Sequence, residues 1–238
     1  MFRRSIEVNF KEWKTSISRK PLILRGARQV GKTSVIRKFA SENFDIFLEI
    51  NFEKIDQNNL FRNVTNVDDL IRRAEIITKK NVVEGKTLLF IDEIQELPEI
   101  MRLLRFFAEE KSNLHLIVAG SLLEAKMSGE WNVPVGRVEY MYLYPMTFFE
   151  YLEAMGEEKL INNLEIGQEL LKKHLDNYLL VGGMPEAILN FVKSNSFTKV
   201  QEIHERLLTS YKEDINKYAT TSDRKYLELI MDFGPKIA

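Results

Sequence analysis

Eight consecutive residues carry the clearest chemistry in the chain: Gly26-Ala27-Arg28-Gln29-Val30-Gly31-Lys32-Thr33, which follow the pattern Gly-x-x-x-x-Gly-Lys-Thr. The two glycines permit backbone angles that turn successive N–H groups toward a phosphate. Lys32 can then reach the β- and γ-phosphates, and Thr33 can offer its hydroxyl to Mg²⁺. The pattern therefore predicts a binding loop for a nucleoside triphosphate.

This interpretation requires a strand before the loop and a helix after it. Leu22-Ile23-Leu24 has the composition of a buried strand, and residues 34–40 continue as a helix whose N-terminus adds partial positive charge. Arg28 can approach the nucleotide, although its side chain is expected to point to solvent. The residues expected to bind the nucleotide are Gly26, Arg28, Gln29, Val30, Gly31, Lys32, Thr33 and Ser34.

A second candidate motif is the apolar run Leu88-Leu89-Phe90-Ile91, which ends in Asp92 and Glu93. Asp92 is expected to hold Mg²⁺ through its water shell, and Glu93 to act as the general base that polarises the attacking water. Strands often end on solvated acids, so the pair is informative mainly because it follows a phosphate-binding loop. It favours hydrolysis over a small-molecule kinase. The chain has no Asn-Lys-x-Asp segment for guanine, which favours ATP over GTP.

Two further residues are candidates with open alternatives. Ser121 follows the apolar run Leu114 to Ala119 and could contact the γ-phosphate or the attacking water, or it could simply cap the next helix. Arg137 follows the loop 128–136 and could stabilise transition-state charge, within the same chain or in a neighbouring subunit. It could equally form a surface ion pair.

The elements that must position these residues alternate between strands and helices over the first 145 residues, which predicts an α/β fold of the P-loop NTPase type. The Asp92 strand is expected to be separated from the loop strand by one other, giving a parallel sheet of order 5-1-4-3-2. The five predicted strands are Pro21 to Arg25, Ile46 to Phe52, Thr87 to Ile91, Leu114 to Ala119 and Val138 to Tyr144.

After Pro145 the patterns are helical, and residues 146–220 are predicted to form an all-helical lid behind an ATPase core at 1–145. Thr198 and Gln201 have the spacing of a capping box at the start of a long amphipathic helix. Residues 221–238 are predicted to begin a C-terminal domain that is truncated here.

The composition of the chain mainly excludes classes of function and location. A net charge of −1 gives no global field toward nucleic acid, and the absence of cysteine excludes disulfides and thiolate chemistry. The N-terminus is unlike a signal peptide, and no apolar run reaches membrane-spanning length. A cytoplasmic location without a membrane partner is therefore expected.

Taken in order, several segments resemble those of bacterial and archaeal AAA-superfamily ATPases that carry a C-terminal domain of unknown function. These segments are Arg3 or Arg4, Trp13, residues 20–33, Asp92-Glu93-Ile94-Gln95, Gly120-Ser121, Gly136-Arg137, residues 145–151 and Gly182-Gly183-Met184-Pro185.

The resemblance implies an AAA core with a helical lid, and it raises two expectations about partners. One is a homo-oligomer, and the other is a DNA or protein partner bound through the missing C-terminal region. The leading hypothesis is an Mg²⁺-dependent ATPase whose nucleotide state moves the lid. The alternatives are a slow-turnover signalling or DNA-associated switch, in which occupancy is the output, and a P-loop kinase with a small acceptor.

Overall fold

The computed structural model describes residues 1–120, 136–165, 167–219 and 221–237. Contacts divide the chain into a sheet unit, Met1–Glu150, and a helical unit, Tyr151–Ala238. Each unit is compact in itself. The three-part division proposed from the sequence stays a prediction. No helix among the described residues is both long enough and apolar enough to cross a lipid bilayer.

The sheet unit contains five parallel strands in the order β2-β3-β4-β1-β5, which confirms the predicted order. Because β4 lies between β1 and β3, the phosphate-binding loop and the Asp-Glu pair are separated by one strand, as expected. The strands are β1 (Leu22–Arg25), β2 (Ile46–Asn51), β3 (Thr87–Asp92), β4 (His115–Ala119) and β5 (Glu139–Tyr142).

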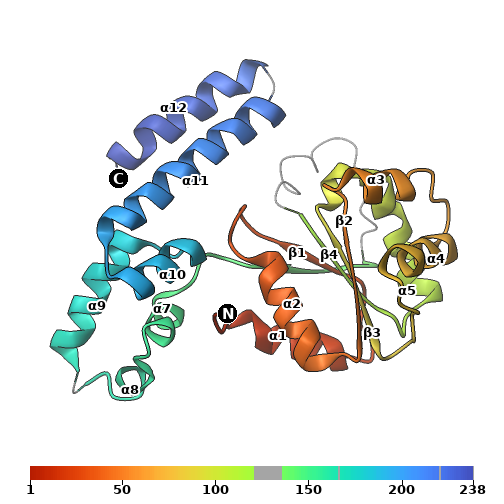
Figure 1. Ribbon diagram of the computed structural model, residues 1–238, viewed down its shortest axis with the longest axis horizontal. Helices are drawn as coiled ribbons and strands as arrows, with labels where there is room; N and C mark the ends of the chain where they lie inside the picture. Colours follow the sequence, from red (N-terminus) through yellow and green to blue (C-terminus); the bar gives the residue numbers. More distant parts are fainter. Residues whose placement is uncertain (121–135, 166, 220, 238) are drawn as a thin grey trace. The chain divides into compact units, whose positions relative to one another are not determined.

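Helices cover both faces of this sheet (Figure 1). On one face lie α1 (Ile6–Thr15) and α2 (Lys32–Asn43), and on the other lie α3 (Ile55–Phe61), α4 (Val67–Thr78) and α5 (Leu104–Glu110). Helix α5 is preceded by two 3₁₀ segments, η1 (Ile94–Glu96) and η2 (Pro98–Leu103). Pro98 occupies the first turn, as expected for a residue without an N–H.

Alternation along the strands builds two cores. In β1, Leu22 and Leu24 pack toward α1 and α2, whereas Ile23 packs toward α4 and α5. Strands β3 and β4 divide their buried residues between the same two clusters, because successive side chains of a strand point to opposite faces. The double-sided burial explains why these strands read as continuous apolar runs in the sequence. This burial also fixes the positions of the carboxyl ends of the strands, where the candidate site lies.

The helical unit has no strand among its described residues. Its helices are the C-terminal part of α7 (Phe148–Ala154), α8 (Glu158–Ile161), α9 (Gln168–Val181), α10 (Pro185–Ser194), α11 (Phe197–Tyr218) and α12 (Thr221–Ile237).

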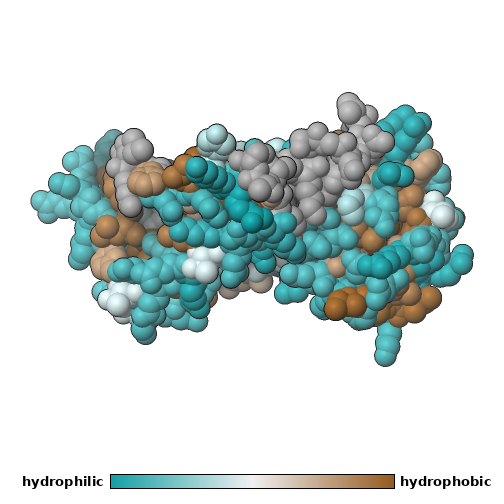
Figure 2. Space-filling view, turned by 90° about the horizontal axis from the view of Figure 1, so that it is seen from above, coloured by the Kyte–Doolittle hydropathy of each residue, from teal (hydrophilic) through white to brown (hydrophobic). Residues whose placement is uncertain are grey.

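In the turn between α9 and α10, Gly182 ends one helix at a φ of 69° and Pro185 starts the next. The capping box at Thr198 and Gln201 is wrong. Ser196 is the N-cap instead, accepting from the N–H of Lys199 at 3.5 Å, and Thr198 lies inside the helix. Hydrophilic side chains predominate on the surface in Figure 2, with hydrophobic ones in smaller patches.

Candidate functional site

The phosphate-binding loop connects β1 to α2 and adopts left-handed backbone angles at three of its residues. Gly26 has a φ of 148°, Gln29 of 63° and Gly31 of 95°. A Cβ on Gly26 would lie 2.3 Å from the carbonyl oxygen of Leu143 at the end of β5, which is far inside van der Waals contact. Gly26 is therefore required both for its angle and for the close approach of β5.

Lys32 is the first residue of α2 and is only 7% exposed. Its Nζ donates to the carbonyl oxygens of Gly26 and Ala27, each at 2.9 Å, so the amine lies under the loop. Burial lowers the pKa of Lys32, while the charges of Glu93 and Asp92 act in the opposite direction. A buried ammonium of this kind would be stabilised by an anion at the loop.

Asp92 is the last residue of β3 and is 2% exposed. Its Oδ2 accepts a hydrogen bond of 2.6 Å from Thr33 Oγ1, and its Oδ1 accepts one of 3.0 Å from the N–H of Glu93. Burial raises the pKa of Asp92, more than the Thr33 hydrogen bond lowers it. A hydroxyl and a buried carboxylate in contact fit the oxygen ligands that Mg²⁺ prefers, with water completing the shell. Thr33 and Asp92 are thus the residues that would hold a magnesium ion.

Glu93 follows β3 in a left-handed conformation, with a φ of 53°. This turn directs its side chain into the pocket instead of along the strand. The side-chain amide of Gln95, which is buried, donates to Glu93 Oε2. No role for Gln95 was predicted from the sequence. The only signal was its place in the segment Asp92-Glu93-Ile94-Gln95.

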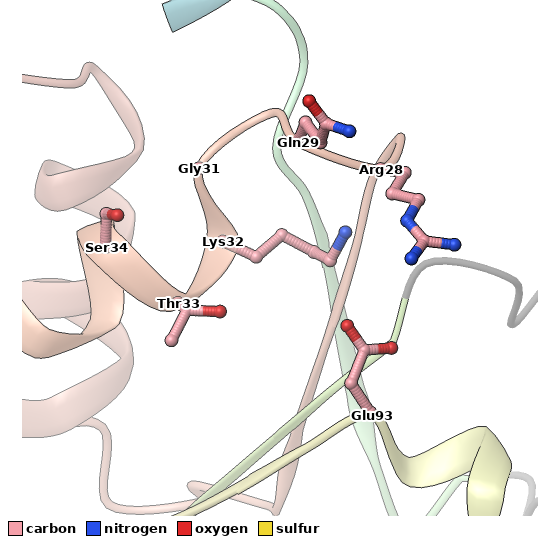
Figure 3. Close-up of a pocket in the computed structure, with 7 residues that line it drawn as sticks. All are labelled: Arg28, Gln29, Gly31, Lys32, Thr33, Ser34 and Glu93. Atoms are coloured by element: carbon pink, nitrogen blue, oxygen red, sulfur yellow. The ribbon is translucent and has the colours of Figure 1, made fainter. Parts of the chain in front are cut away.

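Lys32, Thr33 and Glu93 line an open pocket of about 250 Å³ at the carboxyl ends of the strands, and Asp92 contacts this lining through its hydrogen bond with Thr33. In Figure 3 the side chains of Arg28, Lys32 and Glu93 converge on this space. Arg28 is half-buried, and its charge lowers the pKa of Lys32, which differs from the expectation that it points to solvent. The complete lining is Arg28, Gln29, Gly31, Lys32, Thr33, Ser34 and Glu93.

Among the described residues, four predicted site residues lie outside this lining: Gly26, Val30, Asp92 and Arg137. The side chain of Val30 is fully buried in the core beneath the loop, so Val30 can contribute only its backbone to the pocket. Arg137 is 50% exposed and forms an ion pair of 3.1 Å with Glu109 on α5. Its proposed role as an arginine finger stays a prediction. Ser121 lies outside the described residues.

A comparison with protein families gives two matches. The AAA domain family matches residues 18–152, which include the phosphate-binding loop and the Asp-Glu pair. A domain of unknown function, DUF8612, matches residues 172–236 in the helical unit. A comparison with curated protein sequences gives no match.

Solved structures with a similar fold include the Walker-type ATPase PABY2304 of Pyrococcus abyssi. Its TM-score is 0.59 at 18% identity, over 92% of this chain and 77% of that chain. C. elegans PCH-2 has a TM-score of 0.48 at 13% identity, over 85% of this chain and 66% of that one. Drosophila ORC bound to DNA has a TM-score of 0.45 at 17% identity, over 86% of this chain and 67% of that chain. The likeness to the archaeal ATPase is one of fold.

Proposed function

Because this chain belongs to the AAA domain family, we propose that it binds ATP together with Mg²⁺ and hydrolyses it at the pocket beside the phosphate-binding loop. One observation carries the proposal. Lys32, the Thr33–Asp92 pair and Glu93 come from β1–α2 and β3 and meet at one edge of the sheet. A buried cation, a hydroxyl–carboxylate pair and a second carboxylate are the groups that phosphoryl transfer to water requires.

Each residue has a distinct task in this proposal. Lys32 exchanges its bonds to the loop carbonyls for phosphate oxygens, and the N-terminus of α2 adds positive potential. Thr33 and Asp92 would hold a magnesium ion, whose charge would offset that of the phosphates. Glu93 orients the attacking water and accepts its proton. Arg28, at the opposite wall from Glu93, contributes charge toward the phosphates.

We infer that nucleotide state is transmitted to the helical unit, as the leading hypothesis from the sequence states. A second candidate is a switch whose output is occupancy, and the bond between Gln95 and Glu93 favours it. A carboxylate that already accepts from a buried amide is less available to a water, so basal turnover would be slow. Steady-state hydrolysis that stays near zero at all protein concentrations and with candidate partners would favour the switch.

The proposal is tested by titrating ATP and Mg²⁺ into the wild type and into Lys32→Met, with calorimetry as the readout. Lys32→Met should lose binding by at least about 100-fold, since a buried charge-assisted contact to phosphate is removed. Lys11→Met, at an exposed position on α1, is the matched control and should bind as the wild type does. Equal affinity of the wild type and Lys32→Met would reject the nucleotide site.

A further inference from the structure

Arg4 is a buried arginine outside the nucleotide pocket, with a side chain that is 6% exposed. Its Nη1 donates to the carbonyl oxygen of Val30 at 3.2 Å, and its Nη2 donates to that of Tyr144 at 2.6 Å. Its Nε lies 3.3 Å from Oε1 of Glu150 on α7. One side chain therefore joins the phosphate-binding loop, the segment after β5 and the start of α7.

The shape of the guanidinium suits this arrangement. Arginine presents five N–H donors in a planar fork and stays charged at all relevant pH values, whereas lysine offers a single charged nitrogen. Glu150 is held in turn by the N–H of Ser5 at 2.7 Å, the hydroxyl of Ser5 at 2.9 Å and the N–H of Thr147 at 2.9 Å. The three contacts of Arg4 use three different nitrogens, whereas the donors of a lysine at position 4 would share a single nitrogen and could not match this spacing.

The same N-terminal segment also contacts α2, the helix whose N-terminus completes the loop. Glu7 Oε1 accepts from the N–H of Arg4 at 2.8 Å, and the Nζ of Lys38 lies 2.8 Å from both carboxylate oxygens of Glu7. The N-terminal segment thus contacts the loop on both sides, through Arg4 to Val30 within the loop and through Glu7 to Lys38 beyond it. The cost of desolvating buried charges offsets much of their attraction, so this network need not increase the stability of the fold. We infer that its main effect is to fix the relative positions of the segments that it joins.

We propose that Arg4 is a positioning residue that couples occupancy of the loop Gly26–Thr33 to the start of α7. The inference rests on the proposed nucleotide-binding function. The Val30 carbonyl belongs to the loop that wraps the phosphates, so a change in its position alters the Arg4 hydrogen bond. Because the same guanidinium donates a hydrogen bond to Tyr144 and forms an ion pair with Glu150, that change reaches the residues from which the chain continues into the helical unit.

The test is amide hydrogen exchange with and without a non-hydrolysable ATP analogue and Mg²⁺, on the wild type and on Arg4→Lys. In the wild type, the nucleotide should slow exchange in residues 26–34 and also in residues 147–154. In Arg4→Lys the protection of 26–34 should remain, that of 147–154 should be lost, and affinity should fall by about tenfold. Arg3→Lys changes an exposed neighbour and should match the wild type.

The possible outcomes distinguish failure of the Arg4 coupling from failure of the proposed nucleotide site. Full nucleotide-dependent protection of residues 147–154 in Arg4→Lys would overturn the coupling while leaving the nucleotide site intact. A wild type that shows no protection of residues 26–34 would reject the proposed function, and the coupling with it. If Arg4→Lys fails to fold, Glu150→Gln decides, because the amide removes the charge that faces Arg4 and keeps one oxygen that can still accept from Ser5, while the N–H of Thr147 loses its acceptor. This variant should also lose protection at 147–154, and unchanged protection there would overturn the coupling.

Discussion

The hydroxyl of Thr33 donates a hydrogen bond of 2.6 Å to the carboxylate of Asp92, which joins the start of α2 to the end of β3. The two residues are 59 positions apart in the chain. Strand β4 lies between β1, which leads into the loop before Thr33, and β3, which ends at Asp92, so the contact spans the carboxyl end of an intervening strand. This pair is the part of the pocket suited to a magnesium ion.

Thr33→Ala should weaken ATP binding in the presence of Mg²⁺ by about 10- to 100-fold, because a hydroxyl that contacts a charged group is removed. Thr33→Ser keeps the hydroxyl and should bind nearly as the wild type does. Calorimetric titrations with Mg²⁺ and with EDTA distinguish a metal role from a packing role. The deficit of Thr33→Ala should disappear in EDTA, and an equal deficit in both conditions would argue against a metal site here.

Glu93→Gln should retain ATP binding within a few-fold and lose steady-state hydrolysis by about 10²- to 10⁴-fold, because an amide cannot accept the proton of the attacking water. Phosphate release at saturating ATP measures turnover, and calorimetry measures binding. Glu99→Gln, exposed on η2, is the matched control. Undiminished hydrolysis in Glu93→Gln would remove this residue from its proposed role.

Gly26→Ala should disrupt the loop, because the added Cβ would meet the carbonyl of Leu143 at 2.3 Å and the φ of 148° disfavours side chains. We expect a loss of about 1–3 kcal/mol in the free energy of unfolding, together with loss of ATP binding. Gly85→Ala is a sharp control, since Gly85 also has a positive φ, of 76°, but nothing lies within 4 Å of its Cβ position.

Urea unfolding and ATP titration on both glycine variants provide the measurement. Gly85→Ala should lose about 1 kcal/mol and bind ATP normally. Equal ATP binding by Gly26→Ala and Gly85→Ala would show that the close approach of β5 does not shape the loop.

His115 should make the fold sensitive to mild acid. It is buried against Trp13 and Phe44, and burial, helped by the charge of Arg19, lowers its pKa from 6.5 to about 4. Between these values the unfolded chain binds a proton that the folded chain does not. Stability is therefore complete above pH 6.5 and falls as the pH decreases toward 4.

This histidine should account for about 1–2 kcal/mol of the loss in the free energy of unfolding. The value is reduced because His115 lines a pocket with Lys14 and Arg19, where solvent partly screens its charge. His115→Phe keeps an aromatic ring in the same cluster and removes the titration. Urea unfolding at pH 7 and pH 4.5 should show a smaller difference for the variant than for the wild type. An unchanged difference would assign the acid sensitivity to other groups.

Much of the sheet unit could be predicted because its signals are local. Each buried strand is a continuous apolar run, and the fixed residues of Gly26–Thr33 have mechanical roles that depend only on neighbouring residues. The spacing between Lys32 and Asp92 was enough to predict the intervening strand, because parallel strands need long crossovers. The cap of α11 was misplaced because Thr198 and Ser196 are both good caps, and propensity alone does not choose between them.

The sequence by itself determined the chemistry of the site: a loop that can wrap phosphates, a lysine, a hydroxyl and two acids on strands of one parallel sheet. Only the tertiary structure decided which groups meet. The left-handed turn that aims Glu93 into the pocket, the Gln95 amide on its carboxylate, and the three contacts of Arg4 all depend on segments far apart in the chain or on backbone angles without a sequence signature. Periodicity reports which face of an element is buried, but the partner of a buried polar group is set by packing in three dimensions.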